Sequence, residues 1–93
     1  LPVAVRDSSF AALLARVMRA DPRLYATIES ASLDRGDVVL AIGDRRIRVR
    51  PEADRTVLQS VTEVLGYLAA NAVAWREIDA RYLGRIFVQK GSA

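Results

Sequence analysis

The chain has 93 residues, which is enough for one small domain with a single hydrophobic core. Hydrophobic residues make up 52% of the sequence and charged residues 27%, a balance typical of a globular protein and not of a disordered one. There is no cysteine and no histidine, which excludes disulfide bonds and thiolate metal sites and removes the most common general base.

The remaining polar residues do not form a catalytic motif. The serines lack the context of a nucleophile elbow, and the carboxylates of residues 34, 37 and 44 fall in predicted turns, where aspartate is expected for its backbone hydrogen bonds. We therefore expect no catalytic residue, no cofactor site and no metal site, and a protein that is not an enzyme.

The sequence carries little information about location. The net charge is +3, and no apolar run approaches the roughly 20 residues of a membrane span. No signal peptide is visible. The absence of cysteine is compatible with both reducing and oxidising compartments. Because the chain begins at Leu1 and not at methionine, we expect a processed form or part of a longer protein. Residues 1–5 fit either a strand or an incoming linker.

The first predicted helix follows the capping candidates Asp7, Ser8 and Ser9 and ends at Asp21-Pro22. Its apolar residues recur with helical spacing and predict a buried stripe, formed by Phe10, Leu13, Leu14, Val17 and Met18.

Three strands are predicted next, over residues 23–33, 38–42 and 45–50, separated by turns at residues 34–37 and 43–44. The third strand alternates, with Ile47 and Val49 on one side and three arginines on the other: Arg46, Arg48 and Arg50. This pattern predicts an antiparallel meander with one face on a core and one in water.

Pro51 ends the third strand, and a capping box at Thr56 and Gln59 is predicted to begin a second helix that runs to about Ala72, with Asn71 as its stop. Its apolar stripe contains Val57, Leu58, Val61, Val64, Leu65 and Leu68. We expect Tyr67 and Trp75 to pack in the core or on the sheet.

Residues 75–90 are predicted to form a final hairpin. In its first arm Ile78, Ala80 and Tyr82 alternate with Glu77, Asp79 and Arg81. Gly84 suits a turn that needs a positive φ, and residues 85–90 form a second arm that ends the sheet. Such an edge strand can accept a strand from a partner; the alternative is a closing hairpin whose edge is only solvated.

The element order α-β-β-β-α-β-β predicts a single two-layer α+β domain over residues 1–93, with two helices on one face of a mainly antiparallel five-stranded sheet. Two further functions are open. Arg46, Arg48 and Arg50 could bind the phosphates of a nucleic acid, although the strand lacks aromatic residues for stacking, and Asp44, Glu52 and Asp54 can neutralise the patch. The last strand could also pair with itself in a self-associating structural domain.

The chain resembles the C-terminal β domain of the FtsQ/DivIB family of bacterial cell-division proteins. The resemblance includes the strand pair VVLAIGDRRIRVR, the helix VLQSVTEVLGYLA, the segment I-D-x-R-Y (Ile78, Asp79, Arg81, Tyr82) and the final strand IFVQK. The I-D-x-R-Y segment is the most specific of these. The family's POTRA domain and transmembrane helix have no counterpart in this sequence.

The resemblance implies a non-catalytic scaffold on the extracytoplasmic (periplasmic) side of the bacterial inner membrane, anchored by an upstream helix. It implies FtsB-like (DivIC-type) and FtsL-like division proteins as partners, with an FtsB segment added as a strand at the C-terminal hairpin. The family's partner-contacting arginine and tyrosine would fall on Arg81 and Tyr82. The partner-binding residues implied in this chain are Arg81, Tyr82, Leu83, Gly84, Arg85, Ile86, Phe87 and Val88.

Overall fold

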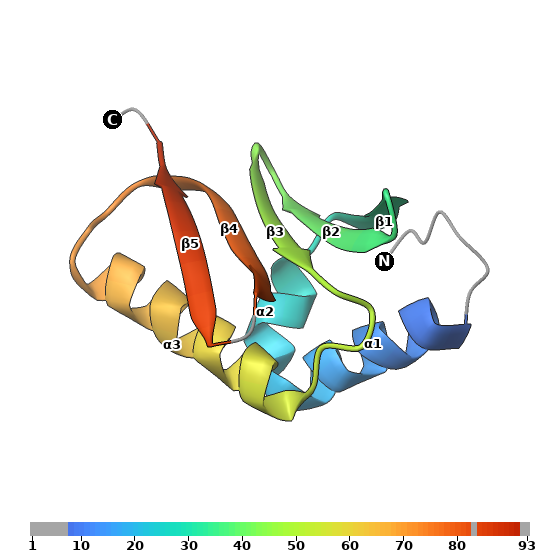
Figure 1. Ribbon diagram of the computed structural model, residues 1–93. Helices are drawn as coiled ribbons and strands as arrows, with labels where there is room; N and C mark the ends of the chain where they lie inside the picture. The colour runs from blue at the N-terminus through green and yellow to red at the C-terminus, as the bar shows by residue number, and fades with distance from the viewer. Residues whose placement is uncertain (1–7, 83, 92–93) are drawn as a thin grey trace.

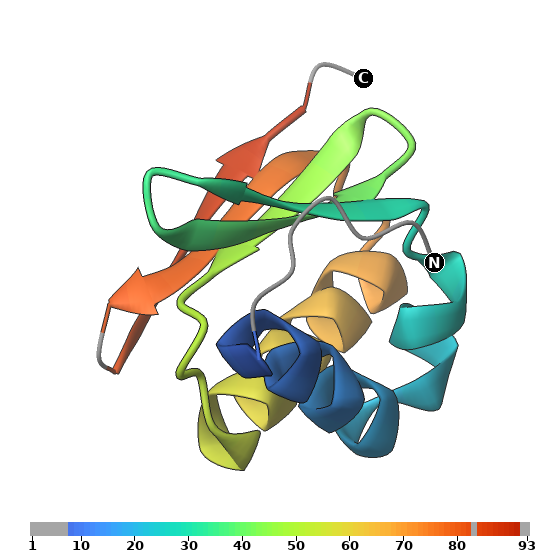
Figure 2. The ribbon, with the colours of Figure 1, turned by 90° about the vertical axis from the view of Figure 1, so that its right-hand side faces the viewer.

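The computed structural model describes residues 8–82 and 84–91, so the predictions for residues 1–5, Asp7 and Leu83 lie outside the described residues. The chain forms an α+β fold in which helices cover one face of a five-stranded sheet (Figures 1 and 2). The elements in order are α1 (Ser8–Ala20), α2 (Pro22–Thr27), β1 (Ser30–Asp34), β2 (Asp37–Ile42), β3 (Arg45–Val49), α3 (Arg55–Ala70), β4 (Trp75–Tyr82) and β5 (Arg85–Lys90).

The strands lie in their sequence order, β1-β2-β3-β4-β5. All neighbours are antiparallel except β3 and β4, which are parallel because α3 carries the chain back across the sheet between them. The predicted fold class is confirmed, and the predicted antiparallel meander corresponds to β1, β2 and β3.

One row of apolar residues crosses the whole sheet and forms the centre of the core. Each member lies opposite the next one, from strand to strand, in the order Ala31, Leu40, Ile47, Ile78 and Val88. The first four are buried, and the row packs against the stripes of α1 and α3. The alternation read from the sequence of β3 therefore places Ile47 and Val49 correctly.

The predicted strand over residues 23–33 is wrong in its first half. Residues 22–27 form α2, because the Asp21 carboxylate accepts a hydrogen bond from the Leu24 N–H over 3.0 Å and Pro22 occupies the first turn. Asp21-Pro22 ends α1, as predicted, but it also begins α2, a helix that was not predicted. A good cap followed by proline outweighs the β propensity of Tyr25 and Thr27.

The predicted start of the next helix is also wrong. Asp54 is its N-cap and accepts from the Val57 N–H over 3.0 Å, so a capping box at Thr56 does not form. Asn71 is the C-cap, as predicted. Tyr67 is 65% exposed on α3 and Met18 is 47% exposed on α1, which corrects the prediction that both are buried.

Candidate partner-binding edge

The strand β5 is an edge of the sheet, as predicted. It pairs with β4 along one side, and none of the other described strands covers its second side (Figure 1). Ile86 and Val88 pack against the core, whereas Arg85, Phe87 and Gln89 are exposed. Gly84, in the turn before β5, has a φ of +68°, a conformation in which glycine avoids the Cβ penalty. Backbone N–H and C=O groups along the second side are thus open to another strand.

The pairing of β4 with β5 contains a bulge next to the turn. Asp79 lies opposite Phe87 and Tyr82 lies opposite Arg85, so two residues of β4 face Ile86 alone. A bulge interrupts the alternation of side chains and redirects those that follow it. The sequence placed Tyr82 on the side of Ile78 and Ala80, which are buried, but Tyr82 is 49% exposed.

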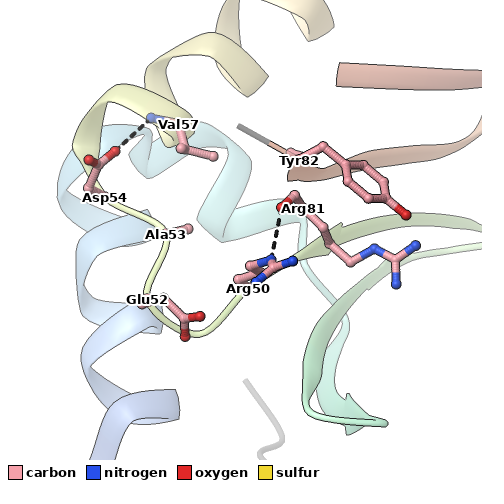
Figure 3. Close-up of a pocket in the computed structure, with 8 residues that line it drawn as sticks. Arg50, Glu52, Ala53, Asp54, Val57, Arg81 and Tyr82 are labelled. Carbon is pink, nitrogen blue, oxygen red and sulfur yellow. Dashed lines mark hydrogen bonds between the residues drawn. The ribbon is translucent and has the colours of Figure 1, made fainter. Parts of the chain in front are cut away.

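Tyr82 and Phe87 form an aromatic pair on the outer face of the sheet. Their ring centroids are 5.6 Å apart and the rings are nearly perpendicular, at 89°. Phe87 is 52% exposed. Figure 3 shows the Tyr82 ring extending away from Val57 of α3, on the side of the Arg81 guanidinium, which is 5.5 Å from the ring centroid. Perpendicular aromatic contacts are favourable, so the pair is a preorganised apolar patch at the edge of the sheet.

A groove lies behind the aromatic pair, between the beginning of α3 and the last hairpin (Figure 3). One part, of about 410 Å³, is lined by Arg50, Ala53, Val57 and Ala80 among others. A second part extends along the hairpin to Arg85 and Ile86. The groove therefore runs from the end of β3 to the start of β5.

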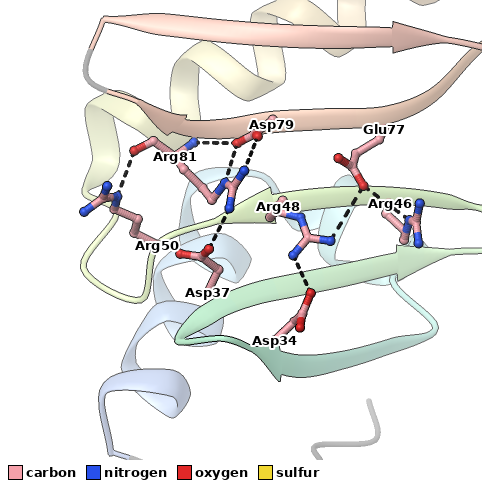
Figure 4. Close-up of polar contacts among 8 residues, drawn as sticks. All are labelled: Asp34, Asp37, Arg46, Arg48, Arg50, Glu77, Asp79 and Arg81. Carbon is pink, nitrogen blue, oxygen red and sulfur yellow. Dashed lines mark hydrogen bonds and ion pairs between the residues drawn. The ribbon is translucent and has the colours of Figure 1, made fainter.

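Arg81 is held by two carboxylates from different strands (Figure 4). Its Nε and Nη2 donate to the two Asp79 oxygens over 2.9 and 2.7 Å, and its Nη1 donates to Asp37 Oδ2 over 2.8 Å. The hydrogen bonds that Asp79 and then Asp37 accept from Arg81 raise the pKa of Arg81, and the hydrogen bond that Arg81 donates lowers the pKa of Asp79. The cluster of Arg81, Asp79 and Asp37 joins β4 to β2 across β3.

The arginine face of β3 is largely occupied by ion pairs with other strands of the sheet. Arg48 contacts Asp34 over 2.8 Å and Glu77 over 3.8 Å, and Arg46 contacts Glu77 over 3.4 Å (Figure 4). The hydrogen bond between Arg48 and Asp34 lowers the pKa of Asp34. The sequence placed the neutralising carboxylates at residues 44, 52 and 54, but those that contact Arg46 and Arg48 come from β1 and β4.

Sequence reasoning did not find the contacts of Arg81, since Asp37 is 44 positions away. A signal for half of the cluster was present, because Asp79 and Arg81 are two positions apart on one strand and so share a face. The contact of Arg45 with Trp75, in which the guanidinium carbon is 4.9 Å from the ring centroid, was not predicted either. Trp75 is buried, as expected.

Within residues 8–82 and 84–91, no group of three or more acidic side chains is arranged to hold a metal ion. The helices of that part are all too short or too polar to cross a membrane. Comparison of the chain with models of known protein families gives no match, and comparison with curated proteins gives none either.

Proposed function

We propose that this chain is a non-catalytic scaffold domain that binds a partner protein by strand addition to β5. The observation that carries the proposal is the combination of an open edge strand with an exposed aromatic pair, formed by Phe87 of that strand and Tyr82 of β4. Ladder hydrogen bonds would supply affinity, and the two rings would supply specificity.

The resemblance to the FtsQ/DivIB family supports a more specific form of the proposal. In this form the domain lies on the extracytoplasmic side of a bacterial membrane and binds an FtsB-like or DivIC-like division protein. Its partner-binding residues are those of the last hairpin, and a membrane anchor would precede this part of the chain.

Binding energies are compatible with this mode. A few ladder hydrogen bonds contribute about 1 kcal/mol each, and a buried tyrosine contact contributes about 2 kcal/mol. A micromolar complex requires about 8 kcal/mol, and association itself has a cost. The partner therefore needs a further contact, for which the groove beside the hairpin offers apolar surface at Val57, Ala80 and Ile86.

The first test is calorimetry of this domain with the extracytoplasmic part of an FtsB-like protein from the same genome. We expect Tyr82→Ala to weaken binding about tenfold or more. The matched control is Tyr67→Ala, which removes an even more exposed tyrosine from α3 and is expected to leave affinity unchanged. Equal affinities for both variants and the unchanged domain would contradict a role for Tyr82, and no binding by the unchanged domain would contradict the partner.

The second test is a proline walk over residues 86–89. Backbone N–H groups of an edge strand point alternately inward and outward, and proline removes the N–H of its own residue. Proline at an inward position breaks a hydrogen bond to β4, whereas proline at an outward position leaves the circular dichroism spectrum unchanged. The variants with an unchanged spectrum are expected to lose partner affinity. Folded proline variants that bind normally would rule out strand addition at β5.

The same open edge supports self-association as a second candidate, in which β5 pairs with β5 of another copy. Light scattering at increasing protein concentration tests self-association, since pairing of β5 with β5 raises the molecular mass with concentration and strand addition by another protein does not. The nucleic-acid alternative predicts affinity that falls steeply with salt and is lost in Arg48→Glu. The contacts of Arg46 and Arg48 with carboxylates do not favour it.

A further inference from the structure

Arg81 lies inside the bulge of β4, and its backbone as well as its side chain is held by other side chains. Its N–H donates to Asp79 Oδ1 over 3.1 Å, and its carbonyl oxygen accepts from Arg50 Nε over 2.9 Å. A bulge disrupts the ladder at the extra residue, so partners for its backbone groups must come from elsewhere. Asp79 and Arg50 provide them here (Figure 4).

The guanidinium of Arg81 is directed at groups of its own chain. Three of its N–H groups donate hydrogen bonds to Asp79 and Asp37, and the contact with Asp79 uses both carboxylate oxygens. Two-point arginine–carboxylate pairs are strong and fixed in direction. A partner carboxylate would meet a guanidinium that two carboxylates already neutralise, and a two-point contact through Nε and Nη2 would require it to displace Asp79.

Arg85 offers a different environment at the same edge. It is exposed at the start of β5, lies opposite Tyr82 in the ladder and borders the groove. Among the described residues, no carboxylate forms an ion pair with it. A cation in that state can meet an acidic group without breaking an existing pair.

From these contacts we propose that Arg81 is a positioning residue and not a partner contact: it fixes the bulge that turns Tyr82 outward against Phe87, while Arg85 provides the cation that an acidic partner segment meets. This deepens the proposed function and depends on it for the roles in binding. It also reverses the role that the FtsQ/DivIB resemblance implies for Arg81.

The variant Asp37→Asn distinguishes the two roles in the binding assay. It leaves Arg81 in place and removes only the charge of a carboxylate that is remote from β5. If Arg81 positions Tyr82, loosening the cluster weakens partner binding, and we expect a loss of about fivefold or more. If Arg81 contacts the partner, Asp37→Asn frees it, and affinity stays the same or rises, which would overturn the proposal.

Double variants test whether Arg81 acts through Tyr82. In the unchanged domain Arg81→Gln is expected to weaken binding, whereas in the Tyr82→Ala background it is expected to add less than about twofold. Arg85→Gln is expected to weaken binding equally in both backgrounds. Additive effects of Arg81→Gln and Tyr82→Ala would overturn the positioning role, and an unchanged affinity in Arg85→Gln would overturn the role of Arg85.

A measurement without partner separates this proposal from the proposed function. In the free domain, nuclear Overhauser contacts between the Tyr82 and Phe87 rings are expected to disappear in Arg81→Gln, while those between Ile47 and Ile78 in the core remain. Arg81→Lys keeps the charge but not the two-point geometry, so it is expected to restore the ring contacts only in part. Persistence of the ring contacts in Arg81→Gln would overturn the positioning role even if partner binding is confirmed.

Discussion

The hydroxyl of Thr62 donates a hydrogen bond to Asp21 Oδ2 over 2.9 Å, while the other carboxylate oxygen of Asp21 caps α2. One side chain therefore begins a helix and attaches it to α3. This double use explains how a helix of only 6 residues is stable, since isolated helices of that length are not.

We expect Asp21→Ala to lower the free energy of unfolding by about 1 to 2 kcal/mol, because it removes both the cap and the contact to α3. Thr62→Val removes only the second contact and is expected to cost less. Urea denaturation of both variants, followed by the fluorescence of the single tryptophan, measures the difference. Equal losses in the two variants would show that the cap itself contributes nothing.

Gly66 lies in the interior of α3, where a Cβ would meet no atom within 4 Å. A close approach of helix and sheet therefore does not explain this glycine, and Gly66→Ala is expected to stabilise the domain by about 1 kcal/mol. Thermal unfolding measures the change. Gly84→Ala is the matched control and is expected to destabilise, because the φ of Gly84 is +68°. A loss of stability in Gly66→Ala would contradict the open space at that position.

Ala72 follows the C-cap of α3 with a φ of +52°, a conformation that favours glycine. The N–H groups of Ala72 and Val73 donate to the carbonyls of Ala69 and Leu68, over 3.2 and 2.9 Å, in the Schellman arrangement. We expect Ala72→Gly to raise the free energy of unfolding by about 0.5 to 1 kcal/mol in urea denaturation. A destabilised Ala72→Gly would show that the left-handed turn is not strained.

The lowered pKa values of Asp34 and Asp79 predict acid sensitivity of the outer sheet face. A carboxyl whose pKa is lower in the folded state stabilises the fold above its unfolded pKa, and this stability is lost as the pH falls below about 4. We expect urea midpoints to decrease between pH 5 and pH 3. The decrease should be smaller in Arg81→Gln, in which Asp79 loses its main partner. An equal decrease in that variant would contradict the link.

The sequence was sufficient for the fold class, for most strand positions and for the buried face of β3. Alternation alone located Ile47 and Val49 on the buried face, and the glycine-containing turns separated the strands at the observed places. Because side chains in a strand alternate with a strict period of two, a regular strand can be read directly. The position of β5 at the edge followed from its place at the end of the hairpin.

The candidate site was harder to predict from the sequence, because its main features depend on contacts between residues that are far apart in the chain. The bulge at Arg81 interrupts the period of two without a glycine to mark it, so Tyr82 was placed on the wrong face. Asp37 contacts Arg81 across β3, and Glu77 contacts Arg46 on the adjacent strand, and the sequence did not give the order of these strands. Met18 and Tyr67 border their apolar stripes, where helical spacing does not separate buried from exposed positions.

The short parallel contact between β3 and β4 has a consequence for folding kinetics. Three residue pairs form it, and they join parts of the chain that are separated by α3, whereas the β1-β2-β3 meander and the β4-β5 hairpin are local. Closing a long loop slows the search for such contacts. We therefore expect the two local units to form first and the β3-β4 contact to close in the rate-limiting step, so that mutations at Ile47 or Ile78, which pair across that contact, slow folding.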